Sequence, residues 1–238
     1  MRFLVTAGNT RELIDQVRDW GNIFTGNTGY SIAMALAAVG EVDLLTSNRA
    51  HLAAVSGGQT TRYAIRGSGF GCHAELRGAL AALMGQHTYD AIFMTAAVSD
   101  YRPMRVFTVV SREADPRDSQ REQWVVQDVQ AGKVKSTHKN IAVLGEPTEK
   151  IVDLFRTEWR HRGLLIKFKL EVGISREELL RIGETSRVSS GADYLVANTL
   201  AMVNGKDAGA YLLREGGHAW VARAQLPGRM VELVSAGK

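Results

Sequence analysis

Short apolar segments alternate along this chain of 238 residues with segments that have helical spacing. Residues 90–95, DAIFMT, are almost entirely apolar, as expected of a central strand in a parallel sheet, since both faces of such a strand are covered. Residues 30–39 carry apolar side chains at intervals of three and four, and Gly40 follows them, which is typical of an amphipathic helix and its end. The alternation predicts an α/β fold of the Rossmann-like kind, with a doubly wound, mostly parallel sheet.

The same periodicity locates the other elements. We expect strands at 3–6, 42–46, 61–65, 90–95, 164–168 and 194–197, helices at 30–39, 72–84, 148–159, 176–188 and 228–235, and a terminal hairpin at 210–222. The stretch at about 104–129 interrupts the alternation, because two apolar segments, 106–110 and 124–129, are joined by a charged link without helical pattern. This predicts an antiparallel arm. The whole chain, 1–238, is interpreted as one domain that carries this arm.

The charge balance restricts the possible partners. Lys and Arg number 29 against 25 acidic residues, a mild and dispersed excess that suits an anionic small molecule at least as well as nucleic acid. Because there is no long basic tract, we expect no nucleic-acid partner. The apolar runs are shorter than the about 18–20 residues of a membrane span, so no membrane partner is expected. Cys72 is the one cysteine and MRFLVTAG enters a strand directly, so we expect a cytoplasmic protein without a signal peptide.

The candidate site consists of the loops that follow the strands, since ligands of open parallel sheets bind beyond the carboxyl ends of the strands. These loops are 7–29, 96–103, 131–136, 169–173 and 198–203. Their polar side chains are those of Asn22, Asp100, Lys133, Lys135, Lys169 and Asn198. Amides, several lysines and one acid favour an anionic ligand, such as a phosphate ester with a metal ion. The histidines show no metal-ligand spacing, so no metal ligand is assigned.

Each of these features has a structural alternative. Gly26 and Gly29 in TGNTG precede a predicted helix, where free N–H groups bind anions, but a plain glycine turn fits equally well. Lys133 and Lys135 would share one face of an extended segment, and the alternative is a solvated strand end. Lys169 could instead form an ion pair with the nearby Glu171, and Asp100 could be a turn residue.

Several motifs, taken in order, resemble one family. They are TAGNTRELIDQVR at 6–18, NIFTGNTGY at 22–30, TAAVSDYRP at 95–103, KVKS at 133–136, FKLEV at 168–172 and YLVANT at 194–199. Together they resemble the phosphopantothenate–cysteine ligase (phosphopantothenoylcysteine synthetase) family, the ligase domain of the DNA/pantothenate metabolism flavoprotein family. The resemblance spans nearly the full chain and is far more specific than any one motif.

The resemblance implies a two-step reaction in coenzyme A synthesis. A nucleoside triphosphate, CTP in most bacteria and ATP in eukaryotes, activates the carboxylate of 4′-phosphopantothenate as an acyl-nucleotide and releases pyrophosphate. The amine of cysteine then attacks to form the amide. Mg²⁺ and lysines would stabilise the charge that develops at the α-phosphate. The motif FKLE at 168–171 resembles the eukaryotic branch, which uses ATP, whereas the base-reading loop at 95–103 resembles the bacterial type. The resemblance therefore implies a slight preference for CTP over ATP. The family also pairs its arms in a homodimer.

The resemblance implies a role for each matched residue. Asn22 and Lys133 would be catalytic, with Asn22 orienting the acyl-nucleotide and Lys133 offsetting charge at the α-phosphate. Substrate binding would involve Arg18 and Asn198. Nucleotide and phosphate binding would involve Gly8, Gly26, Gly29, Ala96, Ala97, Asp100, Lys135, Phe168 and Lys169.

The chain departs from the family pattern at two basic positions and lacks a neighbouring half. Asn27 and Ser136 stand where the family has lysines, which leaves open a non-catalytic relative that binds nucleotide or phosphopantothenate. The flavin-binding decarboxylase half found in many bacterial members is absent, so we expect no flavin. A third hypothesis, an NAD(P)-dependent oxidoreductase, is disfavoured because the strand at 42–46 is followed by SN, without the acidic residue that holds the ribose.

Overall fold

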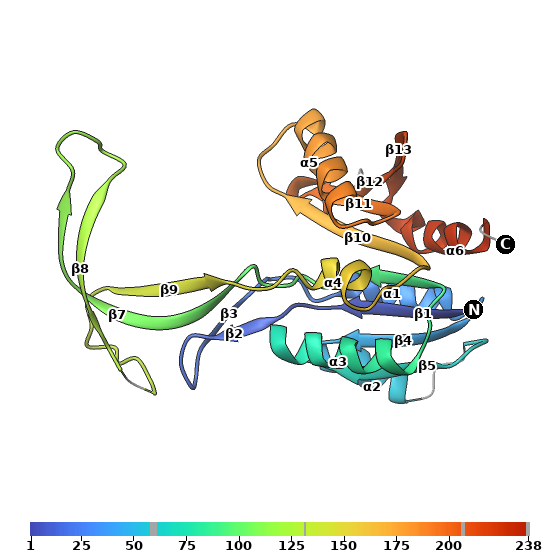
Figure 1. Cartoon of the computed structure of the whole chain (residues 1–238), viewed down its shortest axis with the longest axis horizontal. Helices are drawn as coiled ribbons and strands as arrows, with labels where there is room; N and C mark the ends of the chain where they lie inside the picture. Colours follow the sequence, from blue (N-terminus) through green and yellow to red (C-terminus); the bar gives the residue numbers. More distant parts are fainter. Residues whose placement is uncertain (58–60, 131, 206–207, 237–238) are drawn as a thin grey trace. The chain divides into compact units, whose positions relative to one another are not determined.

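The computed structural model describes residues 1–57, 61–130, 132–205 and 208–236, and its ribbon is drawn in Figure 1. Ala131, the first residue of the predicted lysine loop, lies outside them. The chain forms two compact units. The first comprises Met1–Thr10, Ile23–Ala97 and Lys150–Lys238, and the second comprises Arg11–Asn22 and Val98–Glu149. The expectation of one ligase domain stays a prediction.

The first unit is built on one eight-stranded sheet, in the order β13-β12-β11-β10-β6-β1-β4-β5. Its strands are β1 (Arg2–Ala7), β4 (Glu41–Thr46), β5 (Ile65–Gly69), β6 (Ala91–Met94), β10 (Leu164–Glu171), β11 (Tyr194–Thr199), β12 (Gly209–Arg214) and β13 (Gly217–Ala222). The strands from β11 to β5 pair in parallel, and β12 and β13 are antiparallel. The predicted α/β fold with a mostly parallel sheet is confirmed.

Helices cover both faces of this sheet. They are α1 (Asn27–Leu36), α2 (Arg49–Ser56), α3 (His73–Gln86), α4 (Ile151–Thr157), α5 (Arg176–Ser189) and α6 (Leu226–Ala236), with short 3-10 helices η1 (Leu200–Met202) and η2 (Arg223–Gln225). Val196 of β11 belongs to the core cluster that contains residues of α1 and α6, whereas its neighbour Leu195 packs in a second cluster with Leu179 of α5. Successive strand residues point to opposite faces, so the sheet is doubly wound as predicted.

Two expectations for this unit were wrong or incomplete. The strand expected at 61–65 is found at Ile65–Gly69, because this edge strand has two glycines and a largely exposed surface, so the apolar pattern misplaced it. Helix α2 was not expected. It buries one side chain, that of His51, and so has almost no apolar stripe. Its available signal was Asn48, whose side chain accepts a hydrogen bond from Ala50 N as a helix N-cap.

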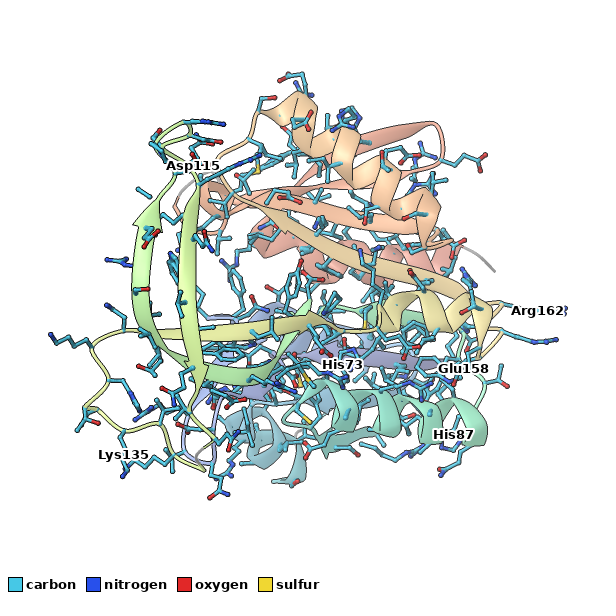
Figure 2. The ribbon with its side chains drawn as sticks, turned by 60° about the vertical axis from the view of Figure 1, so that its left-hand side comes forward. His73, His87, Asp115, Lys135, Glu158 and Arg162 are labelled. Atoms are coloured by element: carbon cyan, nitrogen blue, oxygen red, sulfur yellow. The ribbon has the colours of Figure 1, made fainter. Side chains whose placement is uncertain are left out.

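The second unit is a three-stranded antiparallel sheet in the order β8-β7-β9, with a two-stranded hairpin beside it. The strands are β7 (Tyr101–Ala114), β8 (Glu122–Asp128) and β9 (Ile141–Pro147), and the hairpin is β2 (Arg11–Leu13) with β3 (Asp19–Gly21). The two predicted arm strands are confirmed, and Figure 2 labels Asp115 in the turn between them. Strand β9 and the hairpin were missed. No helix among the residues placed in the structure is long and apolar enough to span a membrane.

Candidate functional site

A change in the direction of winding defines the candidate site of the first unit. From β1 the chain adds β4 and β5 on one side, and then returns to add β6, β10 and β11 on the other side of β1, as the labels in Figure 1 allow the reader to follow. Ligands of doubly wound sheets bind at such a switch point, outside the carboxyl ends of the two neighbouring strands. Here these are the ends of β1 and β6.

Backbone hydrogen bonds join the segments that leave β1 and β6. Ala97 N donates to Gly8 O at 2.9 Å, and Thr10 N donates to Ala97 O at 3.2 Å. Thr95 N and Ala96 N each lie 3.1 Å from Thr6 Oγ1 and donate to it. The structure therefore brings the predicted residues Gly8, Ala96 and Ala97 together at the switch point.

The glycines of this region permit an unusually close approach of backbone segments. Gly8 and Gly26 have φ of 88° and 81°, which side chains other than hydrogen rarely allow. A Cβ on Gly26 would lie 2.0 Å from Gly8 N, and one on Gly29 would lie 2.2 Å from Thr95 Oγ1. The first turn of α1 thus packs directly against the end of β1. The glycines have a packing role, and their predicted role in phosphate binding is compatible with it.

A polar bracket, formed by Asn48 and His51 of the α2 region, contacts the start of α1. His51 Nε2 lies 3.0 Å from Asn27 Oδ1 and 3.3 Å from Asn48 Nδ2. Asn48 Nδ2 donates to Thr25 O at 3.0 Å, and the His51 ring stacks on Tyr30 with centroids 4.4 Å apart. Burial lowers the pKa of His51. No local sequence pattern indicates this bracket, which places a neutral network around Asn27, the position where the family has a lysine.

The carboxyl ends of β10 and β11 carry three further predicted residues. Lys169 Nζ forms an ion pair with Glu171 Oε1 at 3.0 Å, which is the structural alternative considered above. Phe168 packs against the main core, and Asn198 is paired with Leu170 in the sheet register. A pocket of about 490 Å³ lies beyond β11 and is lined by Thr199, Ala201, Met202, Asn204, Gly205, Tyr211 and Trp220. Asn198 is not among these lining residues.

The predicted residues of the second unit lie around the β2–β3 hairpin and residues 132–135, here called the lysine segment. Lys133 and Lys135 are exposed on either side of Val134, which is 2% exposed, so the two lysines alternate with a buried residue as expected of an extended segment. Figure 2 labels Lys135 in this loop. Asn22, exposed, follows β3.

Two more predicted residues of this unit make structural contacts. Arg18 Nη1 lies 3.3 Å from Asp15 Oδ2, and Arg18 Nη2 donates to Val134 O at 3.0 Å. The carbonyl of the exposed Asp100 accepts from Thr148 N at 2.9 Å. Across the described ranges of both units, no three His, Cys, Asp or Glu side chains gather as a metal site.

The fold and the switch point define the class: an α/β protein whose sheet changes its direction of winding between β1 and β6, the position at which doubly wound sheets bind ligands. Residues 1–115 match the family described as DNA/pantothenate metabolism flavoprotein C-terminal domain. A curated relative, the coenzyme A biosynthesis bifunctional protein CoaBC of Thermococcus kodakarensis, is 31% identical over 199 residues, which are 84% of this chain and 41% of the relative. The chain thus spans less than half of that relative's length.

Solved structures agree with this match. The structure of the DNA/pantothenate metabolism flavoprotein from Streptococcus pneumoniae is 26% identical, with a TM-score of 0.78 and 100% of both chains covered. The fold is shared as well by a Cab2 mutant in complex with phosphopantothenate-cysteine, at 14% identity and a TM-score of 0.66, over 99% of this chain and 85% of that one. Over residues 1–115, the chain matches the family of the DNA/pantothenate metabolism flavoprotein C-terminal domain.

Proposed function

We propose that this chain is a phosphopantothenate–cysteine ligase of coenzyme A biosynthesis. The family match over residues 1–115 supports the proposal, as does the aligned relative, which is named as a coenzyme A biosynthesis protein. The Cab2 structure, whose fold is similar, holds phosphopantothenate-cysteine. The match covers the first 115 residues, and the ordered motifs at 133–136, 168–172 and 194–199 extend the resemblance beyond them.

The observation that carries the proposal is the convergence of backbone segments at the switch point. Gly8, Ala96 and Ala97 are joined there by hydrogen bonds, and the glycines at the start of α1 bring a helix N-terminus against β1. Such an N-terminus has a partial positive charge and N–H groups without helical partners, which suit a phosphate. A nucleoside triphosphate is therefore proposed to bind at this end of the sheet.

The proposed reaction has two steps. In the first, a carboxylate oxygen of 4′-phosphopantothenate attacks the α-phosphorus, the bond to the β-phosphate breaks, and pyrophosphate leaves. In the second, the cysteine amine attacks the acyl carbon, the nucleoside monophosphate leaves, and the nitrogen loses a proton. Lys133 and Lys135 would offset charge on the phosphates in the first step, and Asn22 would orient the acyl-nucleotide in the second.

The remaining residues are proposed to hold the reactants. Asp100 would contact the nucleotide, and Arg18 and Asn198 would contact phosphopantothenate. Mg²⁺ would enter with the triphosphate, since this ion is usually held by one or two carboxylates together with substrate phosphates. Lys169 is already paired with Glu171, so its charge is partly compensated. We expect CTP to be slightly preferred over ATP as the co-substrate, and we expect no flavin to take part in the reaction.

A second candidate is a relative that binds these ligands without joining them. It is favoured by Asn27, which replaces a family lysine and whose side-chain oxygen is already occupied by His51. Pyrophosphate release measured with 4′-phosphopantothenate, cysteine and either CTP or ATP distinguishes the two. The ligase predicts release that depends on phosphopantothenate, together with amide formation. Nucleotide binding by calorimetry without any release would favour the second candidate.

A further inference from the structure

The β2–β3 hairpin and the lysine segment of the second unit meet at one buried carboxylate, that of Asp15. Its side chain is 1% exposed. Asp15 Oδ1 accepts from Val17 N at 2.9 Å and from Arg18 N at 2.8 Å, which closes the hairpin turn. Its other oxygen, Oδ2, accepts from Val134 N at 3.1 Å. One oxygen therefore shapes the turn, and the other holds the residue between the two lysines.

Further main-chain contacts hold the same segment. Arg18 Nη2 donates to Val134 O at 3.0 Å, so both backbone polar groups of Val134 bind hairpin side chains. Gln16 N donates to Gly132 O at 3.0 Å. A Cβ on Gly132 would lie 3.1 Å from the Gln16 side chain, which is tight packing. The lysine segment is consequently fixed by its backbone, while the side chains of Lys133 and Lys135 stay exposed.

The hydrogen bonds to Asp15 stabilise its charged form. Hydrogen bonds from Val17 N and Val134 N lower the pKa of the carboxyl, and Arg18 acts in the same direction. A buried carboxylate needs such donors, because leaving it unsatisfied is costly. A lysine segment held only by solvated side chains would sample many conformations, and catalysis by charge stabilisation requires fixed geometry.

We propose that Asp15 is a positioning residue, which acts through Val134 to fix Lys133 and Lys135 against the β2–β3 hairpin. The proposal rests on the proposed function, because it assigns to these lysines the phosphates of the nucleotide. Asp15 itself has no role at the reacting atoms. The lysines would thereby be held in place before substrate binds.

Asp15→Asn tests the contact directly, without any ligand. Asn keeps one oxygen that can accept the two hydrogen bonds of the turn. Its NH₂ group takes the place of Oδ2, which accepts from Val134 N and Arg18 Nη1 in the wild type, so these donors lose their acceptor. Asp19→Asn, on the exposed side of the same hairpin, is the matched control with the same change in charge. Amide hydrogen exchange at Val134 and tryptic cleavage after Lys133 and Lys135 are measured in the intact protein. We expect both to accelerate at least tenfold in Asp15→Asn and to stay at the wild-type level in Asp19→Asn.

Kinetics test whether the contact matters for the reaction. A displacement of about 1 Å can cost roughly 10²-fold in rate, so we expect single-turnover pyrophosphate release to fall by that order in Asp15→Asn. If Asp15 acts through Lys133, the two effects must not add. Asp15→Asn should therefore slow the Lys133→Gln variant far less than it slows the wild type.

The outcomes separate this proposal from the proposed function. Unchanged Val134 exchange in Asp15→Asn overturns it, and so does accelerated exchange with wild-type pyrophosphate release. Fully additive rate losses in the double variant also overturn it, since Asp15 would then not act through Lys133. If the wild-type protein released no pyrophosphate with CTP or ATP, the ligase function would fail, and with it the positioning of catalytic lysines. The exchange comparison would still decide whether Asp15 holds the lysine segment.

Discussion

Replacing Gly29 with alanine tests the close approach of α1 to the end of β1. On helix propensity alone the change stabilises, because alanine is favoured over glycine by about 1 kcal/mol in a helix interior. The structure predicts the opposite sign. Gly29 lies in the first turn of α1, where a new Cβ would be 2.2 Å from Thr95 Oγ1 and 2.9 Å from both Ala7 Cβ and Thr6 O.

The magnitude follows from these contacts. Inserting a methyl group into a packed site costs about 1–3 kcal/mol. Thr95 Oγ1 donates to Thr6 O, so moving it away also weakens a hydrogen bond worth about 1 kcal/mol. The propensity gain offsets a similar amount. We therefore expect Gly29→Ala to lower the free energy of unfolding by about 1–3 kcal/mol, or the melting temperature by about 2–4 °C for each kcal/mol in a chain of this size.

Gly78→Ala is the matched control. Gly78 is exposed in α3, and a Cβ there would meet nothing within 4 Å, so we expect stabilisation of about 0.5–1 kcal/mol. Urea unfolding followed by circular dichroism measures both variants against the wild type. The reasoning is refuted if Gly29→Ala is as stable as Gly78→Ala or more so, because the close approach would then place no steric demand on residue 29.

The remaining predictions concern the reaction, the pH dependence and the arm. Lys133→Gln should slow single-turnover pyrophosphate release by roughly 10²–10³-fold, whereas Asn22→Ala should slow amide formation more than release; equal slowing of both steps in Asn22→Ala would contradict the assigned role. Burial lowers the pKa of His51 below its ordinary 6.5, so the unfolded chain binds a proton more tightly than the folded chain does. The contribution of the neutral His51 to the free energy of unfolding is therefore complete above about pH 6.5 and is lost as the pH falls below it. His51→Gln should therefore lose less stability between pH 7 and pH 5 than the wild type in parallel urea titrations, and an unchanged pH slope would contradict the burial argument. Trp124, on β8, is 46% exposed. We also propose that the arm forms a homodimer, so Trp124→Glu should yield monomers by light scattering at micromolar concentration, and a monomeric wild type would contradict this proposal.

Several of the elements that were predicted correctly in the first unit bury a continuous apolar surface. The strand around residues 91–94 and the helix that contains Leu76 and Leu80 both have buried side chains at the expected spacing. The failures lack this signal. Helix α2 buries only His51. Strand β9 begins with four apolar residues that are partly or fully exposed, and Gly145, Glu146 and Pro147 follow them. It forms a strand because it pairs with β7.

The residues of the candidate site also differ in whether a local sequence signal indicates them. The glycines, lysines and asparagine were assigned from local patterns and ordered motifs, and the location of the site beyond the carboxyl ends of the strands follows from the predicted parallel sheet. The pairing of Lys169 with Glu171 was also foreseen as an alternative, since residues two apart in a strand share a face. The partners of Gly29 and Asp15 were not. No local pattern points to Thr95 as the neighbour of Gly29.

Sequence patterns alone predict the α/β class, the approximate positions of most elements and the family resemblance, because periodicity and motif order are local properties of the chain. The tertiary structure alone decided that the carboxylate of Asp15 holds Val134, which is 119 residues away, and that His51 contacts Asn27 at the start of α1. Periodicity reports that a face is buried but not what buries it. Hydrogen bonds between distant segments depend on strand order, register and turn geometry together, and these are fixed only when the whole chain packs.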